Sequence, residues 1–181
     1  MAGQAKALRK IDILKNLCLG IFMLLYKTLC LGVFVAVKKE KLKILFLCTG
    51  NACRSQMAEG WARKLKSDCI EAFSAGIAPA GLNARTVKVM AEADVDISEQ
   101  FSKHINDLVG IDFDYVITLC DNAKENCPVF YDRGKLIHKP FADPTFLIGD
   151  EEVIMNAFRK TRDEIRDFIM TLPDSLEKEN K

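Results

Sequence analysis

Short apolar runs alternate with segments of helical periodicity between Lys41 and Leu172. The apolar runs of strand length span residues 42–47, 70–74, 115–119 and 136–138. Apolar positions at helical spacing occur in residues 56–66, 83–93, 99–108 and 151–172. Because strands that alternate with helices build βαβ units, we expect a single α/β domain with a parallel four-stranded sheet flanked by helices.

A longer apolar segment, Leu17 to Val37, precedes the predicted domain. Its length suits a membrane span, but Lys27 near its centre opposes insertion by roughly 3 kcal/mol. Two interpretations stay open: an apolar helix that anchors the protein to the inner face of the membrane, and a segment without function that precedes the true translation start. We expect three regions, which are an apolar, basic extension over 1–40, a folded domain over 41–173 and a polar tail over 174–181.

The charge and the cysteine content indicate which binding partners and which cellular compartment to expect. The net charge is +1, but residues 1–43 hold nine basic side chains, and the remainder holds 17 basic against 23 acidic ones. The domain therefore lacks the basic patch of a nucleic-acid-binding protein, and we expect no nucleic-acid partner. The chain has seven cysteines, an odd number. This count indicates redox-active thiols in a reducing cytoplasm rather than a framework of disulfides.

A polar loop joins the first predicted strand to the first predicted helix. It consists of Cys48, Thr49, Gly50, Asn51, Ala52, Cys53, Arg54 and Ser55. Loop amides and a helix N-terminus after a strand attract an anion, and an arginine fork matches two oxygens of a tetrahedral oxyanion. The same positive field favours the thiolate form of Cys48, to which Ser55 can donate a hydrogen bond. The pattern predicts a nucleophilic Cys48 in an oxyanion-binding loop; the alternative is a buried cysteine without chemistry.

Further candidates follow later strands. Cys120 ends one apolar run, and a polar stretch separates it from Cys127; this spacing is poor for structural zinc, and we expect no metal site. Asp143 precedes Pro144 in a loop, where it is either a general acid or only part of a turn. Because ligands bind beyond the carboxyl ends of parallel strands, Cys48, Cys120 and Asp143 are expected at one edge of the sheet.

These motifs resemble those of the low-molecular-weight tyrosine phosphatase superfamily and, within it, those of the thioredoxin-coupled arsenate reductases. The shared stretches are residues 48–60, Ser74-Ala75-Gly76, Thr118-Leu119-Cys120 with Cys127-Pro128, and Asp143-Pro144. The phosphatases typically carry proline at the position of Gln56 and lack the pair Cys120 and Cys127. The resemblance therefore favours the reductase branch.

The resemblance implies that the protein reduces arsenate to arsenite. It implies that Cys48 attacks arsenate while Asp143 assists the loss of a hydroxyl group, and that Cys120 then attacks Cys48 so that arsenite leaves. Cys127 next takes over the disulfide, which thioredoxin reduces as the external reductant. The implied arsenate-binding residues are Thr49, Gly50, Asn51, Ala52, Cys53, Arg54 and Ser55.

Many relatives hold potassium beside the loop at the positions of Asn51, Glu59 and Ser74, with an acidic residue at the position of Lys103. A cation at residue 103 makes a potassium site doubtful in this chain, so we expect no bound cofactor. Separately, we expect a monomeric protein. Two other functions stay open. One is a phosphotyrosine phosphatase that uses the same loop, and the other is a non-catalytic thiol-rich protein that binds arsenite or soft metals.

Overall fold

The computed structural model describes residues 40–125 and 134–176. The apolar segment Leu17 to Val37 and the predicted relay residue Cys127 lie outside these ranges. Within them, no helix is both long and apolar enough to cross a membrane. The region boundaries expected at residues 40 and 173 stay a prediction.

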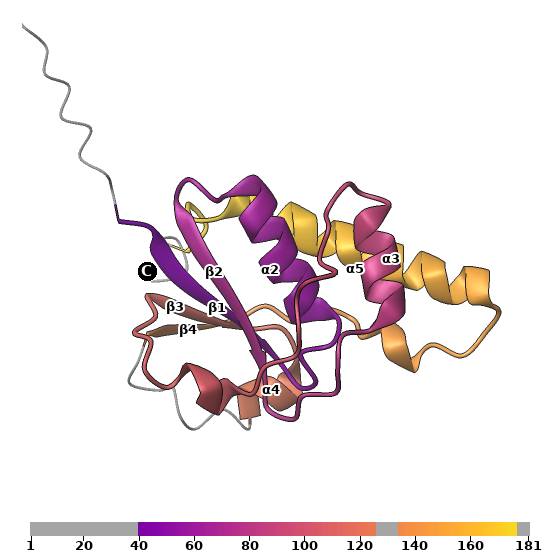
Figure 1. Ribbon diagram of the computed structural model, residues 1–181, viewed down its shortest axis with the longest axis horizontal. Coiled ribbons are helices and arrows are strands. Elements are labelled where there is room, and N and C mark those ends of the chain that lie inside the picture. The colour runs from indigo at the N-terminus through magenta and orange to yellow at the C-terminus, as the bar shows by residue number, and fades with distance from the viewer. Residues whose placement is uncertain (1–39, 126–133, 177–181) are drawn as a thin grey trace, which may run out of the picture. The chain divides into compact units, whose positions relative to one another are not determined.

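The described strands form one parallel sheet. They are β1 Leu42–Cys48, β2 Ile70–Gly76, β3 Tyr115–Thr118 and β4 Lys135–His138. Their order is β2-β1-β3-β4, so β1 lies inside the sheet and pairs with both β2 and β3 (Figure 1). The last five residues of β1 are buried, which is why this strand is an unbroken apolar run in the sequence. The predicted parallel four-stranded α/β fold is confirmed.

The longer helices pack together beside the sheet. They are α2 Arg54–Leu65, α3 Ala84–Ala91 and α5 Glu151–Thr171, while α4 Asp121–Glu125 is a short helix after β3. α2 packs on β2 and on α5, and α5 also packs on α3, as Figure 1 shows. α3 begins after Asn83, whose side chain accepts hydrogen bonds from the backbone N–H groups of Arg85 and Thr86 and so caps the helix.

The segment 99–108 differs from its predicted helical form. It is helical only at its end, in the short 3₁₀ helix η1 Ile105–Leu108. The preceding residues are not helical, and His104 forms an isolated parallel bridge with Gly76. The Lys103 carbonyl accepts a hydrogen bond from Gly76 N–H at 2.9 Å, and Ser102 Oγ donates to the Asn51 carbonyl at 2.6 Å. These contacts with β2 and with the polar loop replace the hydrogen bonds that a helix would make, and they place the segment directly behind the loop.

Candidate active site

The polar loop turns sharply between β1 and α2. Asn51 has φ of +45°, in the left-handed region that asparagine tolerates better than most residues. Gly76, at the end of β2, leaves space for this turn, because a Cβ there would lie 2.7 Å from the Thr49 carbonyl oxygen and 2.8 Å from Asn51 N. The glycine is therefore required where the loop backbone packs against the end of the neighbouring strand.

Cys48 ends β1, and its side chain points into this loop. Its sulfur accepts a hydrogen bond from Asn51 N–H at 3.1 Å and lies 2.9 Å from Ser55 Oγ. The residue is 3% exposed, so its sulfur is largely shielded from water. α2 begins at Arg54, which adds the positive end of a helix to the same place.

Arg54 lies opposite Asp143 at the loop. Its Nη2 lies 2.5 Å from Asp143 Oδ2, and its Nη1 donates to the Phe141 carbonyl at 3.1 Å. Asp143 also caps the short 3₁₀ helix η3 Pro144–Phe146, where its Oδ1 accepts hydrogen bonds from Thr145 N and Thr145 Oγ1. A guanidinium and a carboxyl group thus come together from segments that are far apart in the sequence.

A cleft of about 580 Å³ opens over the loop. The predicted residues Cys48, Arg54, Cys120 and Asp143 all line it. The remaining loop residues in its wall are Thr49, Gly50, Ala52 and Cys53. The structure thus brings together Cys48, Cys120 and Asp143, which were expected at one edge of the sheet. The predicted relay residue Cys127 lies outside the described residues.

Cys120 comes from the end of β3 and reaches the loop. Its sulfur lies 3.3 Å from Thr49 Oγ1, and the same oxygen accepts a hydrogen bond from Asn122 Nδ2 at 3.3 Å. Cys120 is buried, and α4 begins at the next residue. A second thiol therefore stands beside the loop that carries Cys48.

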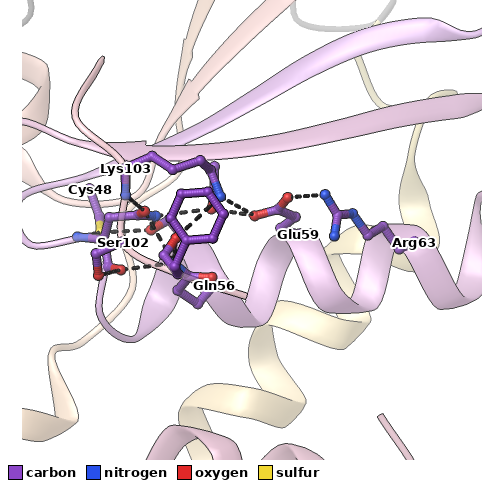
Figure 2. Close-up of polar contacts among 10 residues, drawn as sticks. Cys48, Gln56, Glu59, Arg63, Ser102 and Lys103 are labelled. Atoms are coloured by element: carbon purple, nitrogen blue, oxygen red, sulfur yellow. Dashed lines mark hydrogen bonds and ion pairs between the residues drawn. The ribbon is translucent and has the colours of Figure 1, made fainter. Parts of the chain in front are cut away.

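A polar layer behind the loop was only partly foreseen from the sequence (Figure 2). Asn51 Nδ2 donates to Ser74 Oγ at 2.9 Å, and Ser74 Oγ donates to Glu59. Gln56 Nε2 donates to the carbonyl groups of Asn51 and Phe101, both at 2.9 Å. Neither this role of Gln56 nor that of Ser102 was predictable from the sequence, since no local motif marks a contact between segments 45 to 51 residues apart.

The site combines a cysteine at a strand end, a loop of oxyanion-binding shape and an arginine at a helix start. The family model described as low molecular weight phosphotyrosine protein phosphatase matches residues 43–181. The chain belongs to this phosphatase family.

Among curated proteins, the chain is similar in sequence to arsenate reductases. The arsenate reductase of Oceanobacillus iheyensis is 44% identical over 126 residues, which are 70% of this chain and 91% of the relative. The arsenate reductase of Bacillus licheniformis is 46% identical over 137 residues, which are 76% of this chain and 99% of the relative. Both likenesses cover at least nine tenths of the relative, so they do not depend on the loop alone.

A solved arsenate reductase structure is also similar to this chain. An arsenate reductase in its reduced state superposes with a TM-score of 0.62 and 28% identity, over 75% of this chain and 98% of its own. The fold of this chain therefore matches nearly the whole of that solved structure.

The second cysteine of this family loop differs from the first. Burial raises the pKa of the Cys53 thiol to about 12, from an ordinary value of 9.0. Cys53 is therefore a neutral thiol at physiological pH. Because the thiolate is the reactive form of cysteine, Cys53 is poorly suited to act as a nucleophile.

The residues at the family's potassium position face an ammonium group in this chain. Lys103 Nζ lies 3.4 Å from Glu59 Oε2 and 3.3 Å from the Phe101 carbonyl oxygen. The lysine thus places a positive charge beside two of the oxygens at this position, and the absence of a potassium ion stays a prediction. In residues 40–125 and 134–176, no group of three or more His, Cys, Asp or Glu side chains is suited to hold a metal ion.

Proposed function

We propose that this protein is an arsenate reductase that draws its electrons from thioredoxin through an intramolecular disulfide relay. The observation that carries this proposal is the position of Cys120, whose sulfur lies 3.3 Å from Thr49 Oγ1 on the loop that follows Cys48. A second thiol at the loop serves a reduction, whereas hydrolysis of a phosphate ester needs none. The names of the relatives support the same activity.

Arsenate is a tetrahedral oxyanion and would bind where the loop amides and the start of α2 converge. The residues proposed to hold it are Thr49, Gly50, Asn51, Ala52, Cys53, Arg54 and Ser55. Arg54, at the rim of the cleft, would turn its guanidinium from Asp143 to two arsenate oxygens. Arsenate binding thus frees the Asp143 carboxylate from its ion pair with Arg54, so that Asp143 can carry a proton in the first chemical step.

In the first chemical step, the Cys48 thiolate attacks arsenic. A sulfur–arsenic bond forms, and the bond from arsenic to one hydroxyl group breaks. The released Asp143 carboxylate takes a proton from the bound arsenate and delivers it to this hydroxyl group, which leaves as water. The product is a covalent adduct between Cys48 and arsenic in its pentavalent state.

In the second step, the Cys120 thiolate attacks the sulfur of Cys48. A disulfide forms, and the electron pair of the sulfur–arsenic bond stays on arsenic, which leaves as trivalent arsenite. Cys127 then attacks Cys120 and frees Cys48, and a dithiol such as that of thioredoxin reduces the Cys120–Cys127 disulfide by two exchanges. Each attack needs a sulfur to reach its target, so the segment from Cys120 to Cys127 has to move, and α4 within it is only five residues long.

The relay also sets the conditions under which the protein works. Its thiols have to be reduced between turnovers, so we propose that the enzyme works in a reducing cytoplasm with thioredoxin as its protein partner. We also propose that it is a monomer. A membrane anchor at Leu17 to Val37 is a separate proposal. Fractionation of cells that express the full chain tests it, and recovery of all the protein in the supernatant would contradict it.

Arsenate-dependent oxidation of NADPH, in the presence of thioredoxin and its reductase, tests the proposed activity. We expect turnover that requires arsenate, thioredoxin and Cys120. Cys69→Ser is the matched control, because Cys69 lies before β2 and outside the cleft, and it is expected to keep the wild-type rate. Binding of arsenite or soft metals without any turnover would contradict the proposal and favour a non-catalytic binder.

A phosphatase is the second candidate function, because the loop, Arg54 and Asp143 are the groups that hydrolysis of a phosphate monoester needs. In that case Cys48 would form a phosphocysteine that water cleaves. Turnover of p-nitrophenyl phosphate without any reductant, at a rate unchanged in Cys120→Ser, would favour the phosphatase. Arsenate turnover that depends on Cys120 would favour the reductase.

A further inference from the structure

A histidine that the proposed mechanism does not use lies beside the second thiol. His138 ends β4 and lies next to Thr118 of β3 in the register of the sheet. Its ring Nδ1 lies 2.9 Å from Thr118 Oγ1, and its Nε2 lies 3.0 Å from Asp121 Oδ1. Asp121 is the first residue of α4 and directly follows Cys120. The ring thus bridges the end of the sheet and the start of the helix beside this thiol.

The bridge forms whether or not the ring of His138 is charged. A carboxylate only accepts hydrogen bonds, so Nε2 carries the hydrogen of the contact with Asp121. A hydroxyl group both donates and accepts, so Thr118 can donate to Nδ1 of a neutral ring or accept from Nδ1 of a charged one. Both charge states therefore keep a donor aimed at Asp121.

The three side chains are not a second catalytic site. Thr118, His138 and Asp121 stand in the order of a nucleophile, a base and an orienting acid. Thr118 is fully buried, however, and neither Thr118 nor His138 lines the cleft. A substrate in the cleft would not reach this hydroxyl group, so the bridge acts through position and not through chemistry of its own.

The hydrogen bonds of the sheet hold the backbone after β3 as far as Leu119. Its N–H donates to the Leu47 carbonyl at 2.8 Å, and its carbonyl accepts from Phe141 N–H at 3.1 Å. The next carbonyl, that of Cys120, accepts from Lys124 N–H at 3.2 Å within α4 itself. α4 has only five residues, and a helix of this length is not stable on its own. The position of Cys120 therefore depends on what attaches the start of α4 to the rest of the domain.

Side chains attach the start of α4 from two sides. On the side of β1, Thr49 Oγ1 lies 3.3 Å from the Cys120 sulfur and 3.3 Å from Asn122 Nδ2. On the side of β4, His138 contacts Asp121. The side chain of Asp121 is 80% exposed, and that of His138 is 21% exposed. Because water solvates an exposed carboxylate well without any partner, this contact fixes where α4 begins and does not serve to neutralise a buried charge.

We propose that His138 is a positioning residue for the second thiol. Its bond to Asp121 holds the start of α4 against the sheet and so keeps Cys120, which is 8% exposed, beside the loop and shielded from solvent. This inference rests on the proposed function in so far as Cys120 is the thiol that attacks Cys48. In the relay, the bond keeps Cys120 in place before this attack, and it breaks when the disulfide passes on to Cys127.

The rate at which iodoacetamide alkylates Cys120 tests the proposal in the reduced full chain, with peptide mapping to separate the cysteines. Because Cys120 is buried, the reagent reaches its sulfur only when the start of α4 opens. Loss of one ion pair of this exposure changes such an equilibrium about 2- to 5-fold. We therefore expect His138→Ala to raise the Cys120 rate about 2- to 5-fold and to leave the Cys48 rate unchanged. His138→Gln, whose amide N–H can donate to Asp121, should remove most of this rise.

Asp121 provides a second variant and a double-mutant cycle. Asp121→Ala should raise the Cys120 rate by about the same factor, and it decides the question alone if His138→Ala does not fold. In the Asp121→Ala background, His138→Ala should add no further rise, because the bond is already absent. His104→Asn is the matched control, since asparagine can also cap η1, and it should keep the wild-type rate. An unchanged Cys120 rate in either single variant, an equal rise at Cys48, or an equal effect of His138→Ala in both backgrounds would overturn the proposal.

The alkylation rate needs neither arsenate nor thioredoxin, so the two proposals can fail separately. The expected effects on alkylation, in a protein that does not turn over arsenate, would overturn the proposed function alone. Arsenate turnover that requires Cys120, without any effect of His138→Ala and Asp121→Ala on alkylation, would overturn the role of His138 alone.

Discussion

Arg54 and Asp143 form an ion pair at the cleft, with Nη2 2.5 Å from Oδ2, although 89 residues separate them in the sequence. Arg54 comes from the first residue of α2, and Asp143 comes from the cap of η3. The pair holds the proposed oxyanion clamp and the proposed proton carrier next to each other. If Arg54 turns towards a bound anion, the ion pair breaks and Asp143 loses its positively charged partner.

Asp143→Asn should slow the formation of the adduct and leave oxyanion binding nearly intact. A general acid or base typically contributes about 100- to 10,000-fold to a rate. Asparagine keeps an oxygen that can accept from Thr145 N–H, so the cap of η3 is expected to survive. Single-turnover mixing with arsenate measures the rate, and protection of Cys48 from alkylation by inorganic phosphate measures binding. An unchanged rate would remove Asp143 from the mechanism.

The thiol variants should fail at successive steps of the relay. Cys48→Ser should be inactive, since a hydroxyl group does not form the reactive anion at neutral pH. Cys120→Ser should stop at the covalent adduct, and Cys127→Ser should release one arsenite per enzyme and stop with Cys48 and Cys120 joined. Peptide mapping after a single arsenate turnover distinguishes these states.

Cys53→Ser tests whether the second thiol of the loop takes part in the chemistry. Its thiol is buried and neutral at working pH because its pKa is raised to about 12, so turnover should continue if the loop keeps its shape. A reacted wild-type protein in which Cys120 and Cys127 are still reduced would refute the relay and revive the phosphatase interpretation.

Gly76→Ala should destabilise the domain and weaken phosphate binding. The added Cβ would collide with backbone atoms of Thr49 and Asn51, and overpacking of this kind typically costs about 1–3 kcal/mol. Gly110→Ala is the matched control, because its Cβ would meet no atom within 4 Å. Urea unfolding and phosphate protection of Cys48 measure the two effects. Equal stability of both variants would show that the loop can shift away from β2 without cost.

Potassium should have little or no effect on stability or turnover. The ammonium of Lys103 already lies 3.4 Å from Glu59 Oε2, where a bound ion would otherwise supply the charge. Melting curves in potassium chloride and in tetramethylammonium chloride, at matched ionic strength, give the comparison. A large rise in melting temperature that is specific to potassium would show that Lys103 leaves this position in solution.

Removal of residues 1–40 should leave a folded and active domain. Every described residue of the proposed site lies after Lys41, and β1 begins at Leu42. Circular dichroism, melting curves and the thioredoxin-coupled assay on the shortened chain provide the measurement. Aggregation or loss of activity would mean that the preceding segment packs on the domain and that the boundary is misplaced.

Much of the fold was predictable because its signals are local. An apolar run such as that of β1 marks a buried strand, and the alternation with helical periodicity specifies parallel pairing. The loop was recognisable for the same reason, since Cys48, Arg54 and the start of α2 lie within a few residues of one another. Once the sheet is parallel, Cys120 and Asp143 follow strands and are expected at the same edge.

The remaining features depend on contacts between distant segments, which periodicity does not encode. The segment 99–108 has apolar positions at helical spacing, yet it is not helical where Ser102 and Lys103 bind Asn51, about 50 residues earlier. Gln56 was recognised only as a departure from the phosphatase pattern, whereas its amide joins the loop to Phe101. Burial of Cys53 likewise follows from packing and not from its place in the motif.

The direction of β1 has a practical consequence for handling the protein. Its seven residues run from Leu42 to Cys48, so the two ends of the strand lie roughly 20 Å apart at about 3.3 Å per residue. Glu40 therefore lies at the rim of the sheet opposite the cleft. In a chain shortened to begin at Glu40, a purification tag, a fluorophore or a solid support coupled at this residue would lie away from the cysteine pocket, which makes Glu40 a natural attachment point for an electrode-based arsenic sensor.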